Sequence, residues 1–248
     1  MMRLRLSLFL FIPFILAACS GSNLSGPTAN AALIGPPVNG FGIEQNHVHS
    51  MVILPDANHT IVLATHYGIF RSLDHGVTWQ QTAAGPNQLM QGLMTYSLSY
   101  NPLDPQRLYV LTQPATIPYS GTLGLYTSSD AGKTWQLSIP TTRITSGFVY
   151  LAQAGNESPS EVYIYLSQFG THGLQVSMDN GRHFSQVGSP LPFGELLGLM
   201  TVPNELGHLI VYGNNGIATT SDSGKHWQLV PGILDSIFEL TTSGPTRP

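Results

Sequence analysis

The sequence predicts an all-β fold built from four similar units of four strands each, and three observations predict it. First, 26 glycines and 18 prolines among 248 residues are scattered between short apolar runs, which is typical of many short strands and turns. Second, one turn pattern occurs four times, about 50 residues apart, and a repeat of this length is typical of a four-stranded blade. Third, a strand-like run precedes each copy, at residues 60–64, 107–111, 161–166 and 208–212.

The composition excludes two classes of protein. Apolar residues make up 42% of the chain and charged residues only 9%, against about a quarter in an average protein, so the chain lacks the high charge of a disordered protein. The 9 basic residues against 13 acidic ones leave no positive surplus to neutralise the phosphates of a nucleic acid. We therefore expect a folded protein of one or two domains that does not bind nucleic acid.

The N-terminus has the features of a secretory signal. Two arginines lie within the first five residues, and the apolar run that follows, over residues 8–16, is too short for a membrane-spanning helix of about 20 residues. The run ends in two alanines followed by Cys19, an arrangement that resembles the lipobox cut by the lipoprotein signal peptidase. We expect residues 1–18 to be a lipoprotein signal peptide and Cys19, the single cysteine, to carry the lipid. The alternative is an ordinary signal peptide with an incidental cysteine.

The rest of the chain divides into three parts. Residues 19–40 contain no charge and are largely Gly, Ser, Pro, Asn and Ala, which predicts a disordered tether. The folded body is expected at residues 41–242, with a short tail at 243–248. The lipid on Cys19 would make the membrane a partner, and would hold the body at the cell membrane or the outer membrane, facing the extracytoplasmic space.

The repeated turn has the pattern S/T-x-D-x-G-x-x-aromatic. An Asp side chain can accept hydrogen bonds from the amides of its own turn, Gly two residues later allows a positive φ, and the aromatic ring anchors the outgoing strand. Each copy is therefore expected to be a structural hairpin turn. The positions concerned are Asp74, Gly76 and Trp79; Asp130, Gly132 and Trp135; Asp179, Gly181 and Phe184; and Asp222, Gly224 and Trp227.

This repeat resembles the Asp-box family, also called the bacterial neuraminidase (BNR) repeat, whose members are β-propellers. The resemblance covers about residues 46–230, with departures at Thr220, Phe184, His183 and His226. The paired segments 46–51 and 63–72 are most similar to secreted bacterial proteins described as sialidase-like or glycosyl-hydrolase-like. Sortilin-type domains and photosystem II assembly factors share the box, so the resemblance implies an architecture and not an activity.

The resemblance implies an Asp-box β-propeller of four four-stranded blades, or of five with the last one incomplete. The blades are expected at residues 46–84, 93–139, 147–188 and 196–231. A surplus strand is expected at residues 236–242. It would either begin an incomplete fifth blade or pair with the first blade to close the ring, because an unpaired edge strand promotes aggregation.

Carboxylates are the first candidates for catalysis. The four box aspartates, together with Asp56 and Asp104 in turns beside Pro, are expected to be structural. A glycosidase needs two carboxyl groups that flank one bond. Glu44 and Glu195 both come just before the first strand of a blade. Their side chains would therefore lie on the same face of the propeller, and they are weak catalytic candidates. The alternative is that both are exposed loop carboxylates.

Arginines argue against sialidase activity. Enzymes of the sialidase family, which the repeat resembles, grip the substrate carboxylate with three arginines. Arg107 and Arg182 are expected on the face that carries the box turns, and Arg247 lies in the tail, which leaves Arg71 and Arg143. Two arginines are too few, and the G-x-S-x-G nucleophile motif is also missing.

The nine histidines include three that we expect to converge. His47 and His49 are two residues apart and point to one side of a strand, while His66 ends the neighbouring strand, beside the start of the first. His172, at the equivalent turn of the third blade, would face the same mouth of the propeller. Three neutral imidazoles with an open coordination position suit Zn²⁺ or Cu²⁺. The alternative is that these histidines hydrogen-bond to one another and to loop backbone. The other histidines, at 59, 75, 183, 208 and 226, are expected to be exposed polar residues.

These features predict an extracytoplasmic, lipid-anchored β-propeller that acts as a binding scaffold for a glycan, a peptide or a protein. Enzymatic activity is the less favoured interpretation, and it would be that of a glycoside hydrolase of the sialidase-like type. A metal-dependent activity at the histidine cluster is a further alternative.

Overall fold

The structure is a computed structural model that describes residues 46–145, 149–166, 173–188, 190–192, 195–233, 236–237 and 240. Cys19, Glu44 and His172 lie outside the described residues, as do the predicted signal peptide, tether and tail. Within the described part of the chain, no helix is both long and apolar enough to cross a membrane.

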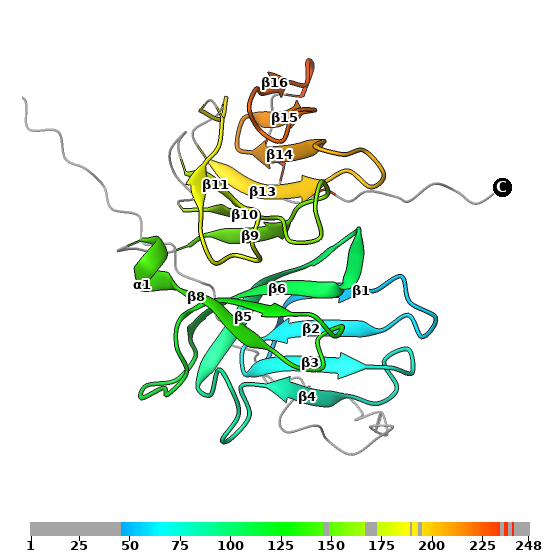
Figure 1. Cartoon of the computed structure of the whole chain (residues 1–248), viewed down its shortest axis with the longest axis vertical. Coiled ribbons are helices and arrows are strands. Elements are labelled where there is room, and N and C mark those ends of the chain that lie inside the picture. Colours follow the sequence, from blue (N-terminus) through cyan, green and yellow to red (C-terminus); the bar gives the residue numbers. More distant parts are fainter. Residues whose placement is uncertain are drawn as a thin grey trace, which may run out of the picture. The chain divides into compact units, whose positions relative to one another are not determined.

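The described chain forms four four-stranded antiparallel sheets, each with its strands in chain order or the reverse (Figure 1). The first sheet contains β1 (Val48–Ile53), β2 (Ile61–Thr65), β3 (Gly68–Ser72) and β4 (Gln80–Ala83). The second contains β5 (Leu93–Asn101), β6 (Asp104–Pro114), β7 (Gly124–Ser128) and β8 (Gln136–Pro140). We refer to these sheets as blades 1 to 4, in chain order.

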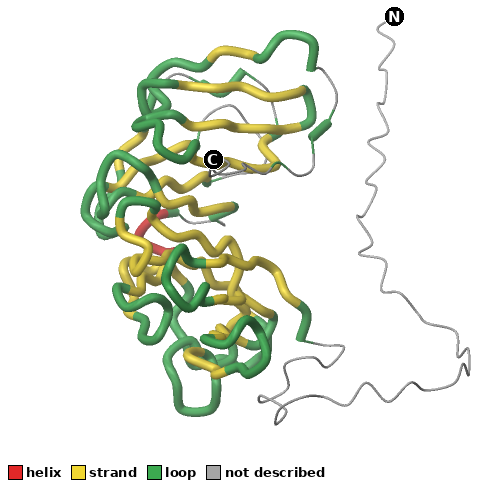
Figure 2. The backbone as a smooth tube through the Cα atoms, turned by 90° about the vertical axis from the view of Figure 1, so that its right-hand side faces the viewer, coloured by secondary structure: helices red, strands yellow, loops and turns green. Residues whose placement is uncertain are grey.

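The second half of the chain repeats this arrangement. Blade 3 contains β9 (Leu151–Ala154), β10 (Val162–Tyr165), β11 (Leu174–Ser177) and β12 (Ser185–Gln186). Blade 4 contains β13 (Leu196–Thr201), β14 (Leu209–Gly213), β15 (Gly216–Thr220) and β16 (Gln228–Leu229). In the described part of the chain the only helix is α1 (Thr141–Ile144), a single turn that follows β8, and the other regular elements in Figure 2 are strands. The predicted all-β fold of four-stranded blades is therefore confirmed.

The predicted surplus strand at 236–242 is described only at residues 236, 237 and 240, and none of these three lies in a strand. The Ile237 amide donates to the carbonyl oxygen of Gly213 at 3.1 Å, and the Ser236 hydroxyl donates to that of Asn214 at 3.1 Å. This part of the segment thus lies beside the end of β14, within blade 4. The remaining residues of the predicted strand lie outside the described part.

Buried side chains between successive blades hold the sheets together. Blades 1 and 2 share an apolar cluster that includes Val62 and Leu108, both fully buried. Corresponding clusters join blade 2 to blade 3, around Tyr109, and blade 3 to blade 4, around Tyr163. Because each large buried side chain contributes about 1.5–3 kcal/mol, these interfaces are the main source of stability. The first strand of each blade is thereby placed beside the first strand of the next.

Hydrogen bonds within each box turn follow the predicted pattern. In the second blade, the Thr134 amide donates to Oδ1 of Asp130 at 2.8 Å, and the Thr134 hydroxyl donates to Oδ2 at 2.6 Å. The Gly132 amide donates to Ser128 Oγ at 2.9 Å. Gly132 has a φ of +78°, and Ala131 before it has a φ of +59°. The turn therefore uses two consecutive left-handed residues, of which the sequence pattern marks only the glycine.

The box turns of blades 2 and 3 also bond to the preceding blade, which the sequence does not reveal. Arg71 Nε donates to the Ala131 carbonyl at 2.9 Å, and Arg107 Nη1 donates to Asn180 Oδ1 at 2.9 Å. Both acceptors occupy the position between Asp and Gly of a box. These two turns thus link neighbouring blades by hydrogen bonds, in addition to closing their own hairpins.

Candidate functional site

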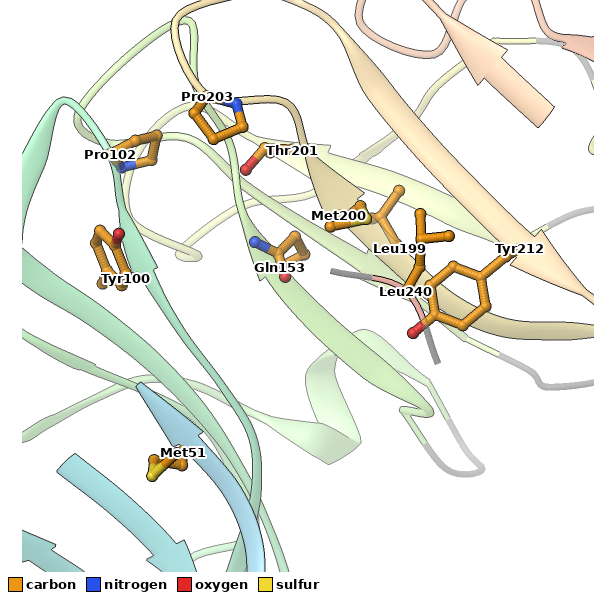
Figure 3. Close-up of a pocket in the computed structure, with 10 residues that line it drawn as sticks. All are labelled: Met51, Tyr100, Pro102, Gln153, Leu199, Met200, Thr201, Pro203, Tyr212 and Leu240. Atoms are coloured by element: carbon orange, nitrogen blue, oxygen red, sulfur yellow. The ribbon is translucent and has the colours of Figure 1, made fainter. Parts of the chain in front are cut away.

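The innermost strands of all four blades line a common hollow. A cavity of about 420 Å³ is lined by side chains from β1, β5, β9 and β13, with others from adjoining segments (Figure 3). A second cavity, of about 310 Å³, shares three of these lining residues. We call the two cavities together the central hollow. The residues that Figure 3 labels around the first cavity are Met51, Tyr100, Pro102, Gln153, Leu199, Met200, Thr201, Pro203, Tyr212 and Leu240.

The central hollow is amphipathic and carries no lysine, arginine, aspartate or glutamate among its described lining residues. Tyr100 and Tyr212 combine an apolar ring with a hydroxyl, and Gln153 offers both a donor and an acceptor. Met51 and Met200 are flexible and polarizable, so they can adapt to ligands of different shape. Such a lining suits a neutral ligand surface that has both apolar and hydrogen-bonding groups.

At the edge of the hollow, the structure brings His47, His49 and His66 together; we call these three residues the histidine cluster. The ring centroids of His47 and His49 are 4.5 Å apart, those of His47 and His66 are 5.1 Å apart, and those of His49 and His66 are 5.9 Å apart. One ligand nitrogen from each ring lies within 4.8 Å of the others. His49 also lines the second cavity of the hollow.

Local backbone structure explains this convergence. Val48 of β1 pairs with Thr65 of β2, so the residues on either side of this pair meet at one corner of blade 1. The His66 amide donates to the His47 carbonyl at 3.0 Å, which fixes that corner. A register shift between Val48 and Ser50 locates a bulge at His49, and such a bulge turns the strand locally.

Partial burial and mutual repulsion favour the neutral forms of His49 and His66. Burial, followed by the nearby His47 and His66, lowers the pKa of His49 to about 4. Burial and the proximity of His47 also lower the pKa of His66. The Nδ1 atom of His66 is buried and has no hydrogen-bond partner among the described residues, which is uncommon for a buried polar atom.

The structure describes only one of the two predicted carboxylates. Glu195 lies directly before β13, but it is not among the residues that line either cavity of the hollow, and Glu44 lies outside the described residues. Burial raises the pKa of Tyr150, and the nearby Glu195 and Tyr212 raise it further, so Glu195 lies close to these tyrosines. Within the described chain, no pair of carboxylates faces the central hollow.

Another carboxylate, Glu161, is structural. It is 1% exposed and accepts hydrogen bonds from the Tyr163 hydroxyl at 2.7 Å and the Glu157 amide at 2.8 Å. Its position next to the apolar run of β10 is the signal that could have indicated burial. Arg71, one of the two arginines that the sequence left for a substrate, donates its Nε to the Ala131 carbonyl.

Of the remaining histidines that the structure describes, His59, His75, His183 and His226 are exposed as expected, whereas His208 is half-buried, with its Nδ1 2.5 Å from Glu205 Oε2. Two of the exposed ones have a defined role in the box turns. His183 Nδ1 lies 2.6 Å from Asp179 Oδ2, and His226 Nδ1 lies 2.6 Å from Asp222 Oδ2. In the first two boxes a threonine hydroxyl occupies this place. The expectation that these two histidines are only exposed polar residues was therefore incomplete. They stand at the position that threonine has in the first two boxes, and this position could have revealed their contact with the box aspartate.

Comparisons with known proteins support the repeat and the fold. The BNR/Asp-box repeat family matches at residues 126–137, which are the third strand and box turn of blade 2. No curated protein matches the chain. All the structural neighbours described below are less than 25% identical to this chain, so the likeness shows the fold alone.

Three solved structures illustrate the likeness. An ancestral GH74 enzyme is 14% identical over 80% of this chain and 25% of its own, with a TM-score of 0.54. YCF48 from Cyanidioschyzon merolae is 13% identical over 79% of this chain and 57% of its own, with a TM-score of 0.53. A gluconolactonase from Xanthomonas campestris is 14% identical over 76% of this chain and 64% of its own, with a TM-score of 0.54. This chain thus spans a quarter of the GH74 enzyme and little more than half of YCF48.

Proposed function

We propose that this Asp-box β-propeller protein is a binding scaffold, anchored by a lipid on Cys19 and displayed outside the cytoplasm. In this proposal the central hollow receives a neutral part of a glycan, a peptide or a protein. The observation that carries the proposal is the lining of the hollow, which comes from the inner strands of all four blades and contains no charged residue other than a titratable histidine.

Two features support binding over catalysis. The repeated aspartates are occupied in their own turns, so they are not free to act on a substrate. Among the neighbours, a chain of a nidogen–laminin complex is 10% identical over 77% of this chain and 67% of its own, with a TM-score of 0.53. That structure is a complex of two proteins, which is in keeping with a fold that presents loops and inner strands to a partner.

A glycoside hydrolase of the sialidase-like type is the second candidate, favoured by the fold that this chain shares with the GH74 enzyme. Most glycoside hydrolases use two carboxyl groups about 5–10 Å apart across the scissile bond. Of the two predicted carboxylates, Glu195 is the one that the structure describes. Hydrolysis of a glycoside that is abolished by Glu195→Gln would establish this second candidate in place of the first.

The binding proposal is tested with purified full-length protein on a glycan array and a peptide library. We expect one class of neutral ligand to bind, and we expect Tyr100→Ala to weaken its binding at least tenfold, because Tyr100 lines the hollow. Tyr119→Ala is the matched control, since Tyr119 is 40% exposed and does not line the hollow. Equal loss in the two variants, or no ligand in either library, would contradict the proposal.

A further inference from the structure

We infer that His47, His49 and His66 bind a divalent transition-metal ion of the Zn²⁺ or Cu²⁺ type, with one coordination position left open at the edge of the central hollow. One ligand nitrogen from each histidine lies within 4.8 Å of the others. Tetrahedral bonds of about 2.0–2.1 Å place ligand nitrogens ~3.3 Å apart. His47 and His49 are exposed, so small rotations of their rings reach this separation.

A second, independent observation is the unpartnered nitrogen of His66. Its Nδ1 atom is buried and has no hydrogen-bond partner among the described residues, while the ring stands edge-on to Tyr67 at 4.8 Å between centroids. Buried polar atoms are normally paired, because leaving one unpaired costs about 1–3 kcal/mol. The cluster therefore contains an imidazole for which the described protein supplies no complete set of partners, and an ion bound at Nδ1 would supply the missing one.

Blade 4 provides an internal comparison for the cluster. The pairing of β13 with β14 repeats that of β1 with β2, including the bulge, and the Asn214 amide donates to the Glu195 carbonyl as His66 does to His47. The positions equivalent to the three histidines are occupied in blade 4 by Glu195, Leu197 and Asn214. The repeat thus fixes the backbone corner but does not require histidine there. Of these two corners, only the one in blade 1 carries three histidines.

The donor set indicates the class of ion and leaves room for a further ligand. Three imidazoles without a thiolate or carboxylate suit Zn²⁺ and Cu²⁺ better than Mg²⁺ or Ca²⁺, which prefer oxygen. Zinc sites with three protein ligands keep a fourth position for water or substrate. Because His49 lines the hollow as well as the cluster, a donor atom on a molecule in the hollow can take that position.

The first test is calorimetric titration of purified, chelator-treated full-length protein with Zn²⁺ and with Cu²⁺. We expect one ion per chain, and we expect His49→Ala or His66→Ala to weaken binding more than about 100-fold, since loss of even an outer-shell partner costs about 10- to 100-fold. His59→Ala is the matched control, because His59 contacts a single histidine, His75, at 6.0 Å between centroids. Unchanged affinity in His49→Ala, or an equal loss in His59→Ala, would overturn the site.

The second test is electron paramagnetic resonance of the Cu²⁺-loaded protein, which counts coordinating nitrogens directly. We expect coupling to three imidazole nitrogens, and coupling to a fourth when free imidazole is added. A wild-type signal with fewer than three protein nitrogens would overturn the site, and a signal that free imidazole leaves unchanged would overturn the open position. Circular dichroism melting of each variant without metal verifies that it is folded. Both tests measure binding of the ion itself. The metal site is therefore tested independently of ligand binding in the hollow.

Discussion

His183 Nδ1 lies 2.6 Å from Oδ2 of Asp179, in the place where the first box turn has the hydroxyl of Thr78, 2.5 Å from Asp74 Oδ2. Two chemically different side chains thus make the same contact at the same position of the repeat. The contact, and not the residue type, is what the turn requires. The substitution of histidine for threonine in the last two boxes therefore preserves the turn.

This equivalence predicts that His183→Thr leaves the free energy of unfolding nearly unchanged, whereas His183→Ala lowers it by about 0.5–1.5 kcal/mol, the usual contribution of one hydrogen bond. The measurement is chemical denaturation at neutral pH. A loss of the same size in both variants would show that the imidazole contributes through something other than its contact with Asp179.

The second prediction concerns the aspartate of a box turn. Asp130 accepts from the Thr134 amide and hydroxyl, so Asp130→Ala removes two hydrogen bonds of about 0.5–1.5 kcal/mol each and is expected to cost about 1–3 kcal/mol of stability. Thermal melting measures the loss, and ligand binding at the hollow, measured below the melting temperature, should be unchanged. A variant that melts like the wild type but no longer binds would mean that the box has a direct role in binding.

The third prediction is the acid stability of the fold. Hydrogen bonds from Thr78 and Ser72 lower the pKa of Asp74 to about 2, and those from Thr134 and Ser128 help to lower the pKa of Asp130. An aspartate in the unfolded chain has a pKa of about 3.9, so the unfolded state binds protons first as the pH falls. The stabilising contribution is complete above about pH 4 and is lost between about pH 4 and pH 2.

Urea denaturation at pH 6, 4, 3 and 2 measures this dependence. We expect a steep fall in unfolding free energy below pH 4, and a shallower fall in Asp130→Asn, which removes one of the titrating groups. An unfolding free energy that stays constant from pH 6 to pH 2 would show that the charge of the box aspartates does not contribute to stability.

The fourth prediction tests the anchor. Cys19→Ala is expected to release the protein from the membrane, or to leave it as an unprocessed precursor, because the proposed lipid is attached to that sulfur. Cell fractionation followed by measurement of the N-terminal sequence distinguishes these two outcomes. Cys19→Ala protein that is cleaved correctly and still needs detergent for extraction would contradict the lipid anchor.

Features set by local physics could be predicted from the sequence. The box turns follow from the preferences of Asp and Gly over a few residues, and the meeting of His47 with His66 follows from antiparallel pairing of neighbouring strands, whereas the bulge at His49 interrupts side-chain alternation and was not predicted. Both depend only on residues that are close in the chain or in one blade.

Features set by contacts between blades could not be predicted in this way. The bond from Arg71 to the Ala131 carbonyl joins two blades, and nothing near Arg71 in the sequence indicates its acceptor. The proximity of Glu195 to Tyr150 likewise depends on how blades 3 and 4 pack. The lining of the hollow, which carries no lysine, arginine, aspartate or glutamate among its described residues, comes from the inner strands of all four blades, so no single segment of the sequence reveals it.

The central claim is that the hollow binds a neutral ligand, and the most direct test is to introduce one charge there without changing shape. Gln153→Glu is nearly isosteric and places a carboxylate in the hollow, whereas Gln80→Glu places the same group on the exposed strand β4. The measurement is the affinity of both variants for the ligand found in the glycan and peptide screen. The account predicts at least a tenfold loss for Gln153→Glu and wild-type affinity for Gln80→Glu, and wild-type affinity in Gln153→Glu would contradict it.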